Sequence, residues 1–138
     1  NSPALSVAGG DTNVGLEVTT KGTGVVKFND AAYNPEATLT DGATINWAVN
    51  AEPVAKVTLG GNRTLAAPTG SATGQFVSLL IIQDGTGSRT LSFNAVYEFS
   101  GDTAPTLTTT ANRGDLFVFR YNGTKWLEAG RTLNLIVS

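Results

Sequence analysis

The sequence contains no cysteine and no histidine among its 138 residues. Without cysteine there is no disulfide framework, no thiolate nucleophile and no zinc–thiolate site. Without histidine the chain lacks the usual general base at neutral pH and the commonest metal ligand. We therefore expect a protein that is not an enzyme and that holds no metal and no cofactor.

Charge is also scarce, and no long apolar run is present. Charged residues make up 14% of the chain, below the ~25% that is usual for soluble domains. The nine Lys and Arg never cluster, which argues against nucleic acid as a partner, because phosphates require a basic stripe. No apolar run approaches the ~20 residues that span a bilayer, and no signal peptide opens the sequence, so we expect no membrane insertion.

The residues that are abundant are those of a β protein. A chain of this length can bury one core but not two ordinary ones. It begins with Asn1 rather than Met, from which we expect an excised or processed piece of a longer protein. Short runs rich in Val, Ile, Thr and aromatic residues alternate with turn signals, which predicts an all-β antiparallel sandwich resembling a jelly roll. The expected strands are Leu16–Thr19, Val25–Phe28, Thr44–Val49, Ala55–Leu59, Arg63–Ala66, Phe76–Gln83, Arg89–Phe93, Asp115–Tyr121, Lys125–Ala129 and Leu133–Val137.

Two strands indicate which faces are buried. In the run "LFVFRY" Phe117 and Phe119 point to one side, while Leu116 and Val118 point to the other. The run "QFVSLLIIQD" is apolar on both faces, so it is either central and covered twice or faces a second copy of the protein. Asn122-Gly123 lies between the runs "LFVFRY" and "TKWLEA" and is the strongest hairpin signal in the chain.

The glycine-rich stretch "IIQDGTGSRTLSF", residues 81–93, could be a phosphate loop, a calcium loop or a bend. A phosphate loop requires Lys and a following helix, and an EF-hand loop requires oxygen side chains at alternate positions with a Glu at the twelfth. Neither pattern is present. The stretch therefore reads as a hairpin loop from Asp84 to Ser88 in which Gly supplies the positive φ.

The acidic and aromatic residues permit a site but favour structural roles. A carboxylate pair could hydrolyse glycosides if two acids met in a cleft. The candidate acids all lie at turns or strand ends, where solvated turn residues are normal: Asp41, Glu52, Asp84, Glu98 and Asp102. Trp47, Tyr97 and Trp126 could stack on sugars, but large aromatic side chains are mostly buried, and burial is the preferred interpretation for Trp126.

The first thirty-five residues differ from the rest, because their apolar side chains are diluted by many glycines. The phrase "DTNVGLEVTTKGTGVVKF", residues 11–28, resembles the shaft and collar sequences of bacteriophage tail fibres, and residues 57–130 look like the β-sandwich head at the end of such fibres. The resemblance implies a trimeric virion protein with no catalytic residues. We expect an N-terminal stem at 1–35 and a β-sandwich head at 36–138.

We therefore expect the chain to be a non-enzymatic structural protein of a phage particle, namely a fibre head that contacts a glycan or protein on the host surface and binds other virion proteins. Capsid decoration is the alternative, and a polysaccharide depolymerase the weaker one, since depolymerases normally need a long β-helix. The loop "NAVYEFSGDTAP" is the expected ligand site, with Tyr97 stacking on a sugar and Asp102 accepting hydroxyl hydrogen bonds. Alternatively, Tyr97 and Phe99 tuck under this loop as a small core. The expected trimer interface consists of Leu5, Val7, Val14, Leu16, Val18, Val25, Val26 and Phe28.

Overall fold

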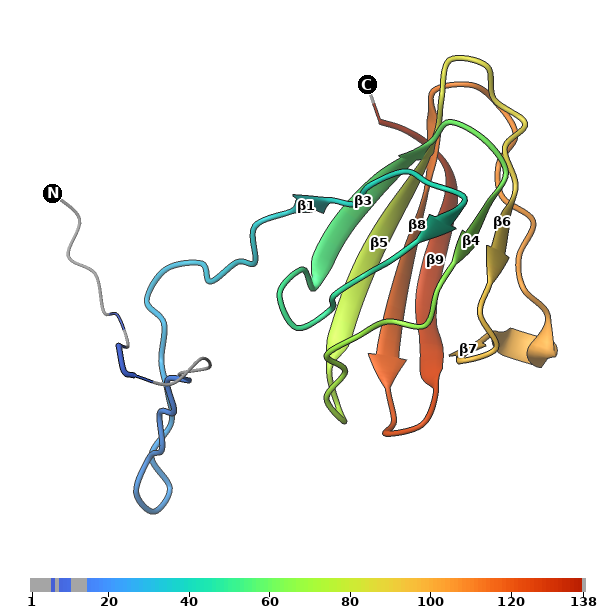
Figure 1. The fold of residues 1–138 in the computed structure, drawn as a ribbon. Helices are drawn as coiled ribbons and strands as arrows, with labels where there is room; N and C mark the ends of the chain where they lie inside the picture. The colour runs from blue at the N-terminus through green and yellow to red at the C-terminus, as the bar shows by residue number, and fades with distance from the viewer. Residues whose placement is uncertain (1–5, 7, 11–14, 138) are drawn as a thin grey trace, which may run out of the picture. The chain divides into compact units, whose positions relative to one another are not determined.

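The computed structural model describes residues 6, 8–10 and 15–137. By its contacts the chain divides into two units, 1–33 and 34–138. The second unit is built from strands and one short 3-10 turn, η1 (Ser100–Asp102). Its strands are β1 (Ala37–Thr38), β2 (Thr44–Ile45), β3 (Val54–Leu59), β4 (Arg63–Leu65), β5 (Phe76–Gln83), β6 (Leu91–Phe93), β7 (Tyr97–Glu98), β8 (Arg113–Tyr121) and β9 (Trp126–Ile136) (Figure 1).

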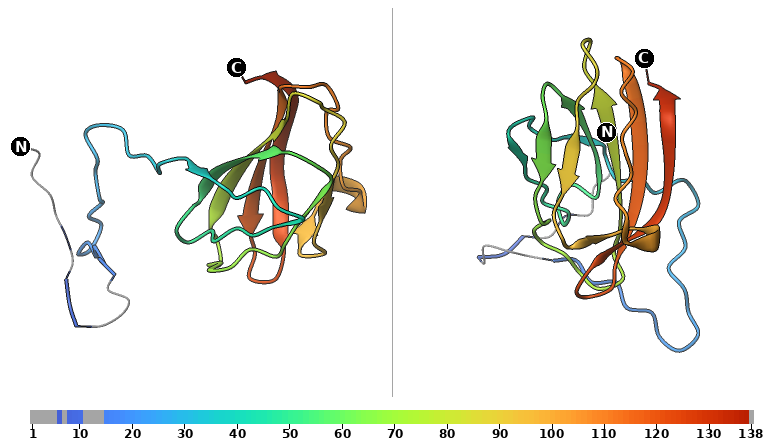
Figure 2. Two further views of the ribbon diagram at one scale, coloured as in Figure 1. Left: turned by 45° about the horizontal axis from the view of Figure 1, so that its top comes forward. Right: turned by 90° about the vertical axis from the view of Figure 1, so that its right-hand side faces the viewer.

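The strands form a curled six-stranded sheet, in the order β1-β3-β5-β8-β9-β7, and a small sheet, β2-β4-β6 (Figure 2). The all-β prediction is confirmed, but the prediction of an antiparallel jelly-roll sandwich is wrong. The small sheet is entirely parallel, and the large sheet is mixed, with β1, β3 and β5 parallel and β5, β8 and β9 antiparallel. Strand periodicity gives the face of each residue, but not the direction of the neighbouring strand.

The chain alternates between the two sheets as it advances. We call each pair of successive strands a coil: β1 and β2 form coil 1, β3 and β4 coil 2, and β5 and β6 coil 3. Equivalent strands of successive coils pair in register, for example Ala37 with Ala55 and Ala55 with Leu79. Parallel neighbours need a crossover connection, and here the strand in the opposite sheet serves as that crossover.

The core lies between the two sheets and follows from the alternation of side chains. Every second residue of β5 is buried, and these residues are Val77, Leu79, Ile81 and Gln83. Phe117 and Phe119 of β8 are 0% exposed, as their periodicity predicted, whereas Leu116 and Val118 on the other face are half-buried. The burial expected for Trp126 is also confirmed, as this residue is 1% exposed.

β8 and β9 close the coil stack as an antiparallel hairpin beside β5. The predicted turn at Asn122-Gly123 is confirmed: Gly123 has φ +102°, and the Asn122 side chain accepts hydrogen bonds from the amides of Thr124 and Lys125. β5 is central in the large sheet, as its apolar character predicted. Within residues 34–138, however, its outer face is half-exposed rather than covered twice, and Phe76 at its start is 58% exposed.

Several strand boundaries differ from the prediction. The expected strands Leu16–Thr19 and Val25–Phe28 do not form, because the described part of the chain offers them no partner strand, and an unpaired strand is unstable in water. The two C-terminal strands that we expected are one strand, β9, which bends through register shifts. β1 and β7 contain only two residues each and carry no periodicity signal. None of the described residues lies in a helix long and apolar enough to span a membrane.

The bend after β5 yields a prediction about stability. Gly87 has φ +72°, and a Cβ built there would lie 2.5 Å from the Thr109 carbonyl oxygen. Gly87→Ala should therefore lower the free energy of unfolding by about 2 kcal/mol or more. The control is Gly85→Ala in the same bend, because nothing lies within 4 Å of a Cβ at Gly85. Urea denaturation of the two variants would contradict the structure if it gave equal stabilities.

Candidate functional site

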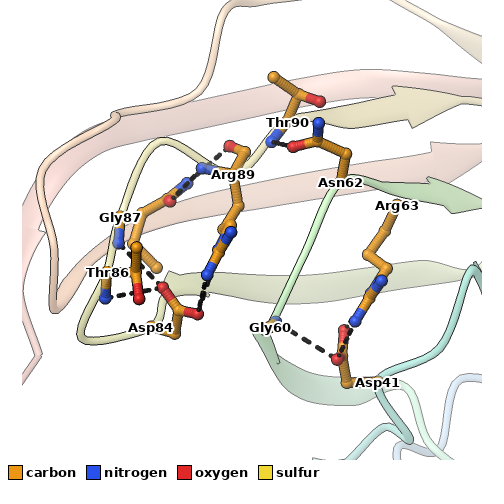
Figure 3. Close-up of polar contacts among 10 residues, drawn as sticks. Asp41, Gly60, Asn62, Arg63, Asp84, Thr86, Gly87, Arg89 and Thr90 are labelled. Carbon is orange, nitrogen blue, oxygen red and sulfur yellow. Dashed lines mark hydrogen bonds and ion pairs between the residues drawn. The ribbon is translucent and has the colours of Figure 1, made fainter.

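Two of the five acids that the sequence singled out, Asp41 and Asp84, lie at corners where the chain passes from the large to the small sheet (Figure 3). Asp41 of coil 1 accepts two hydrogen bonds from the Arg63 guanidinium of coil 2, at 2.8 and 2.7 Å, and a third from the Gly60 amide at 3.3 Å. These hydrogen bonds hold the pKa of Asp41 below its usual range, and those from Arg63 have the largest effect. Burial acts in the opposite direction but is outweighed.

The corner of coil 3 is organised by Asp84. One of its carboxylate oxygens accepts the amides of Thr86 and Gly87 at 2.9 and 2.8 Å, and the other accepts the Arg89 guanidinium at 2.8 Å. The hydrogen bond with Arg89, followed by the two amides, lowers the pKa of Asp84 to about 2. β5 and β6 belong to different sheets, so this bend is a corner and the hairpin prediction for residues 84–88 is wrong; no ladder pairs the two strands.

Two amide side chains complete the corner network. Gln83, which is 2% exposed, accepts the Arg89 amide at 2.8 Å and donates to the Arg89 carbonyl at 3.0 Å. Asn62 of coil 2 accepts the Thr90 amide of coil 3 at 3.0 Å (Figure 3). The network therefore connects coil 1 to coil 2 and coil 2 to coil 3 through side chains, in addition to the backbone ladders.

This arrangement decides what Asp41 and Asp84 can do chemically. A general acid must hold a proton near neutral pH, which in glycosidases requires a raised pKa. Both carboxylates have the opposite shift and are paired with arginine. Their interpretation as turn residues is confirmed. The pairing of Asp84 with the nearby Arg89 is visible in the sequence as an acid before and a base after the glycines, whereas the partnership of Asp41 and Arg63 has no sequence signal.

Tyr97 does not face solvent. It is 5% exposed, its hydroxyl donates to the Ala66 carbonyl at 3.2 Å, and its ring packs against Phe93 and Phe119. Burial raises the pKa of the Tyr97 hydroxyl. Phe99 is also buried, so both aromatic rings belong to the main core rather than to a small core under the loop. The ring of Tyr97 is therefore a support for the loop that follows it.

Asp102 is the exposed member of the pair of predicted ligand residues. It ends η1 with φ +53°, after Gly101 at φ +69°, and its side chain is exposed. The start of the loop is held by Lys125, whose ammonium donates to the Ala95 carbonyl at 2.6 Å and lies 3.4 Å from a Glu98 oxygen. Tyr97 and Asp102 therefore do not share one surface, and Asp102 alone stays a candidate for ligand contact.

The predicted interface residues lie in the first unit. Leu5, Val7 and Val14 fall outside the described residues. The other predicted members are exposed by 49–79% of their area: Leu16, Val18, Val25, Val26 and Phe28. Sequence reasoning missed two further exposed aromatic residues, Tyr33 at 83% and Phe76 at 58%. Both appear in the sequence as isolated aromatics beside polar residues, which is too common a pattern to single them out.

The surface of residues 34–137 carries several small hollows. The hollows have volumes of about 200–300 Å³, at or below the lower end of the 300–1,000 Å³ range of small-molecule sites. In the described part of the chain, no group of three or more acidic, His or Cys side chains is placed to hold a metal. Recognition of a large surface by loops fits this shape better than enclosure of a small molecule.

Comparison with protein families identifies the chain. Residues 33–126 match the family model described as "Putative phage tail fibre C-terminal domain". The chain belongs to this family. The match covers β1 to β8 and the first residue of β9, so the coil stack and its corners are features of the phage tail fibre domain. The resemblance to tail fibres is thereby confirmed, and a tail fibre domain is a component of the virion. Searches of curated proteins and of solved structures found no match.

The corner of coil 3 predicts a pH dependence of stability. Because the pKa of Asp84 is lower in the folded chain than the value of about 4 in an unfolded one, its ion pair stabilises the fold fully above pH 4. This stabilisation is lost as the pH falls toward 2. Asp84→Asn should be less stable than the native chain at pH 7, and it should lose less of its melting temperature between pH 4 and pH 2.

The control for this experiment is Asp102→Asn, which removes an exposed carboxylate that makes no ion pair among the described residues. Its melting temperature should follow the native profile between pH 4 and pH 2. If Asp84→Asn also followed the native profile, the Asp84–Arg89 pair would not be a source of acid sensitivity.

Proposed function

We propose that the chain is the non-enzymatic head of a trimeric phage tail fibre and that it contacts a glycan or protein on the host surface. The observation that carries this proposal is the family match over a rigid coil stack whose loops emerge at the ends of the strands (Figure 1). Loops carried on a rigid scaffold are where recognition usually occurs. The loop after β7 follows the buried ring of Tyr97 and carries exposed Asp102, so it is the best candidate for contact.

Self-association is supported by the exposed surface of the chain. In the first unit the described apolar residues Leu16, Val18, Val25, Val26 and Phe28 are 49–79% exposed. The outer face of the large sheet adds half-exposed Leu80, Ile82, Leu116 and Val118 around its centre. Identical chains that associate form closed rotational assemblies, and three-fold symmetry is what the tail fibre family suggests.

The absence of catalysis is supported by the state of the acids. Asp41 and Asp84 are ion-paired with arginine, and Glu98 lies 3.4 Å from the ammonium of Lys125. A retaining or inverting glycosidase needs one free carboxylate and one protonated carboxyl at the same cleft. The three paired acids thus act as structural anchors, and the head binds its receptor without cleaving it.

The host-contact proposal is tested by competition. The purified chain should occupy receptors and slow the adsorption of the parent phage to its host. Asp102→Ala should weaken this inhibition by about ten-fold, because a charged hydrogen-bond acceptor is lost. Thr58→Ala, at an exposed position on β3, serves as the control and should leave the inhibition unchanged. Failure of the native chain to slow adsorption would contradict host contact, and release of soluble oligosaccharide from the cells would contradict a non-enzymatic head.

The trimer is tested by mass. Light scattering on the whole chain should give about three times the chain mass of 14.3 kDa. A shortened chain that begins at Ala37 should associate more weakly, because it lacks the exposed apolar residues of the first unit. A monodisperse monomer at micromolar concentration would contradict the trimer.

A further inference from the structure

The first coil presents an open edge. β1 is the outermost strand of the large sheet on one side, and β2 is the outermost strand of the small sheet. Among the described residues no strand pairs with the outer side of either one. A hollow of about 250 Å³ lies along this edge and is lined by Thr38, Gly42 and Thr44, among others. Open strand edges of this kind pair readily with another chain.

The coils share a simple pattern of buried residues. In coil 1 the buried side chains include Leu39 before the corner, with Ile45 and Trp47 after it. In coil 2 they include Val57 before the corner and Leu65 after it. Ile45 pairs in register with Leu65, so the buried positions of successive coils lie directly beside one another. A coil is therefore recognised by a simple order of residues. Two inward residues separated by one position come first, a corner that contains glycine follows, and a further inward residue comes after the corner.

Residues 16–28 repeat this pattern. Leu16 and Val18 are spaced by one residue, as are Val26 and Phe28, and glycines lie between the two pairs. Val18 and Val26 are separated by eight positions, the same separation as that between Val57 and Leu65 in coil 2. The turn between the pairs is already formed: the Gly24 amide donates to the Lys21 carbonyl at 3.2 Å, and Gly22 has φ +65°.

Among the residues that the structure describes, this pattern has no strand partner. Residues 15–28 form no strand, and the four side chains that would face inward are 49–71% exposed: Leu16, Val18, Val26 and Phe28. This segment therefore has the alternation of a coil and a formed corner, and the first coil of the stack has an open edge of matching pattern.

We propose that residues 16–28 of one chain form an additional coil on β1 and β2 of a second copy. In this register Leu16 and Val18 continue the row of Ala37 and Leu39, and Val26 continues the row of Ile45. The neighbouring outward residues then also pair, Glu17 with Thr38 and Val25 with Thr44. Each copy donates one coil and receives one, so the contact is head-to-tail and a ring of three copies leaves no first coil open.

This inference rests on the proposed trimer and adds to it the surface on which the copies meet. It is tested in the whole chain by cysteine cross-linking, for which the absence of native cysteine is an advantage. Neighbouring parallel strands are ~4.8 Å apart, within the Cα separation that a disulfide accepts. Val25→Cys and Thr44→Cys, placed on separate co-expressed chains, should give a disulfide-linked pair of chains. The double variant should give covalent trimers.

The control pair is Val25→Cys with Thr58→Cys, because Thr58 is exposed but lies on β3, one coil away from the open edge. Equal cross-linking of the control pair would overturn the proposed register. A disulfide confined to single chains of the double variant would show that the segment stacks on its own chain, which overturns pairing with a second copy. No disulfide in an assembly that still has trimer mass would overturn the inference and leave the trimer intact.

The two adjacent valines provide a second measurement. Val26 is inward in the proposed coil and Val25 is outward, although both are exposed in the single chain, at 49% and 79%. Val26→Asn should weaken association by at least about ten-fold, because a buried valine is replaced by a polar side chain. Val25→Asn should have little effect. Equal weakening by both substitutions would overturn the coil assignment, since it would show no distinction between the two faces.

Discussion

The structure depends on the requirement that every backbone amide and carbonyl in a strand finds a partner. Most of its strands contain only two or three residues, and strands this short have no stability alone. They persist because each coil is hydrogen-bonded to the next in both sheets, in a register that aligns Ala37, Ala55 and Leu79. Alternation between two sheets therefore turns weak local pieces into a continuous core. It also leaves the first coil with an edge that the described chain does not satisfy.

The corners are the second condition for this stacking, because a parallel coil must change sheets at the same level in each turn. Asp41 reaches across to Arg63, and Asp84 reaches forward to Arg89. These ion pairs hold the corners in place, just as the backbone hydrogen bonds of the ladders hold the strands. In this role Asp41 and Asp84 are ion-paired, and the pairing lowers the pKa of both carboxyl groups. Glycoside hydrolysis needs one carboxyl group that stays protonated.

The loops of this tail fibre domain are carried on a stack of coils that is covered on one side and open on the other. The β8–β9 hairpin covers one side of the coil stack, and the aromatic cluster that includes Tyr97 and Phe119 supports the loop that carries Asp102. The opposite side of the stack ends in β1 and β2, which are short and polar on their exposed residues. In the proposed assembly this edge is completed by residues 16–28 of a second copy.

The sequence by itself determined the features that depend on local patterns. The all-β class, the central position of β5, the inward side of Phe117 and the turn at Asn122-Gly123 all follow from periodicity and turn chemistry. The resemblance to tail fibres was visible in the sequences of residues 11–28 and 57–130. Periodicity could not choose the partner of each strand, because alternation looks the same in parallel and antiparallel ladders. Likewise, Asp41 and Arg63 are 22 residues apart, and the inward turn of Tyr97 depends on rings from other strands. Only tertiary packing decided these features, because each is an interaction between different segments of the chain, and local sequence patterns carry no signal for such a partner.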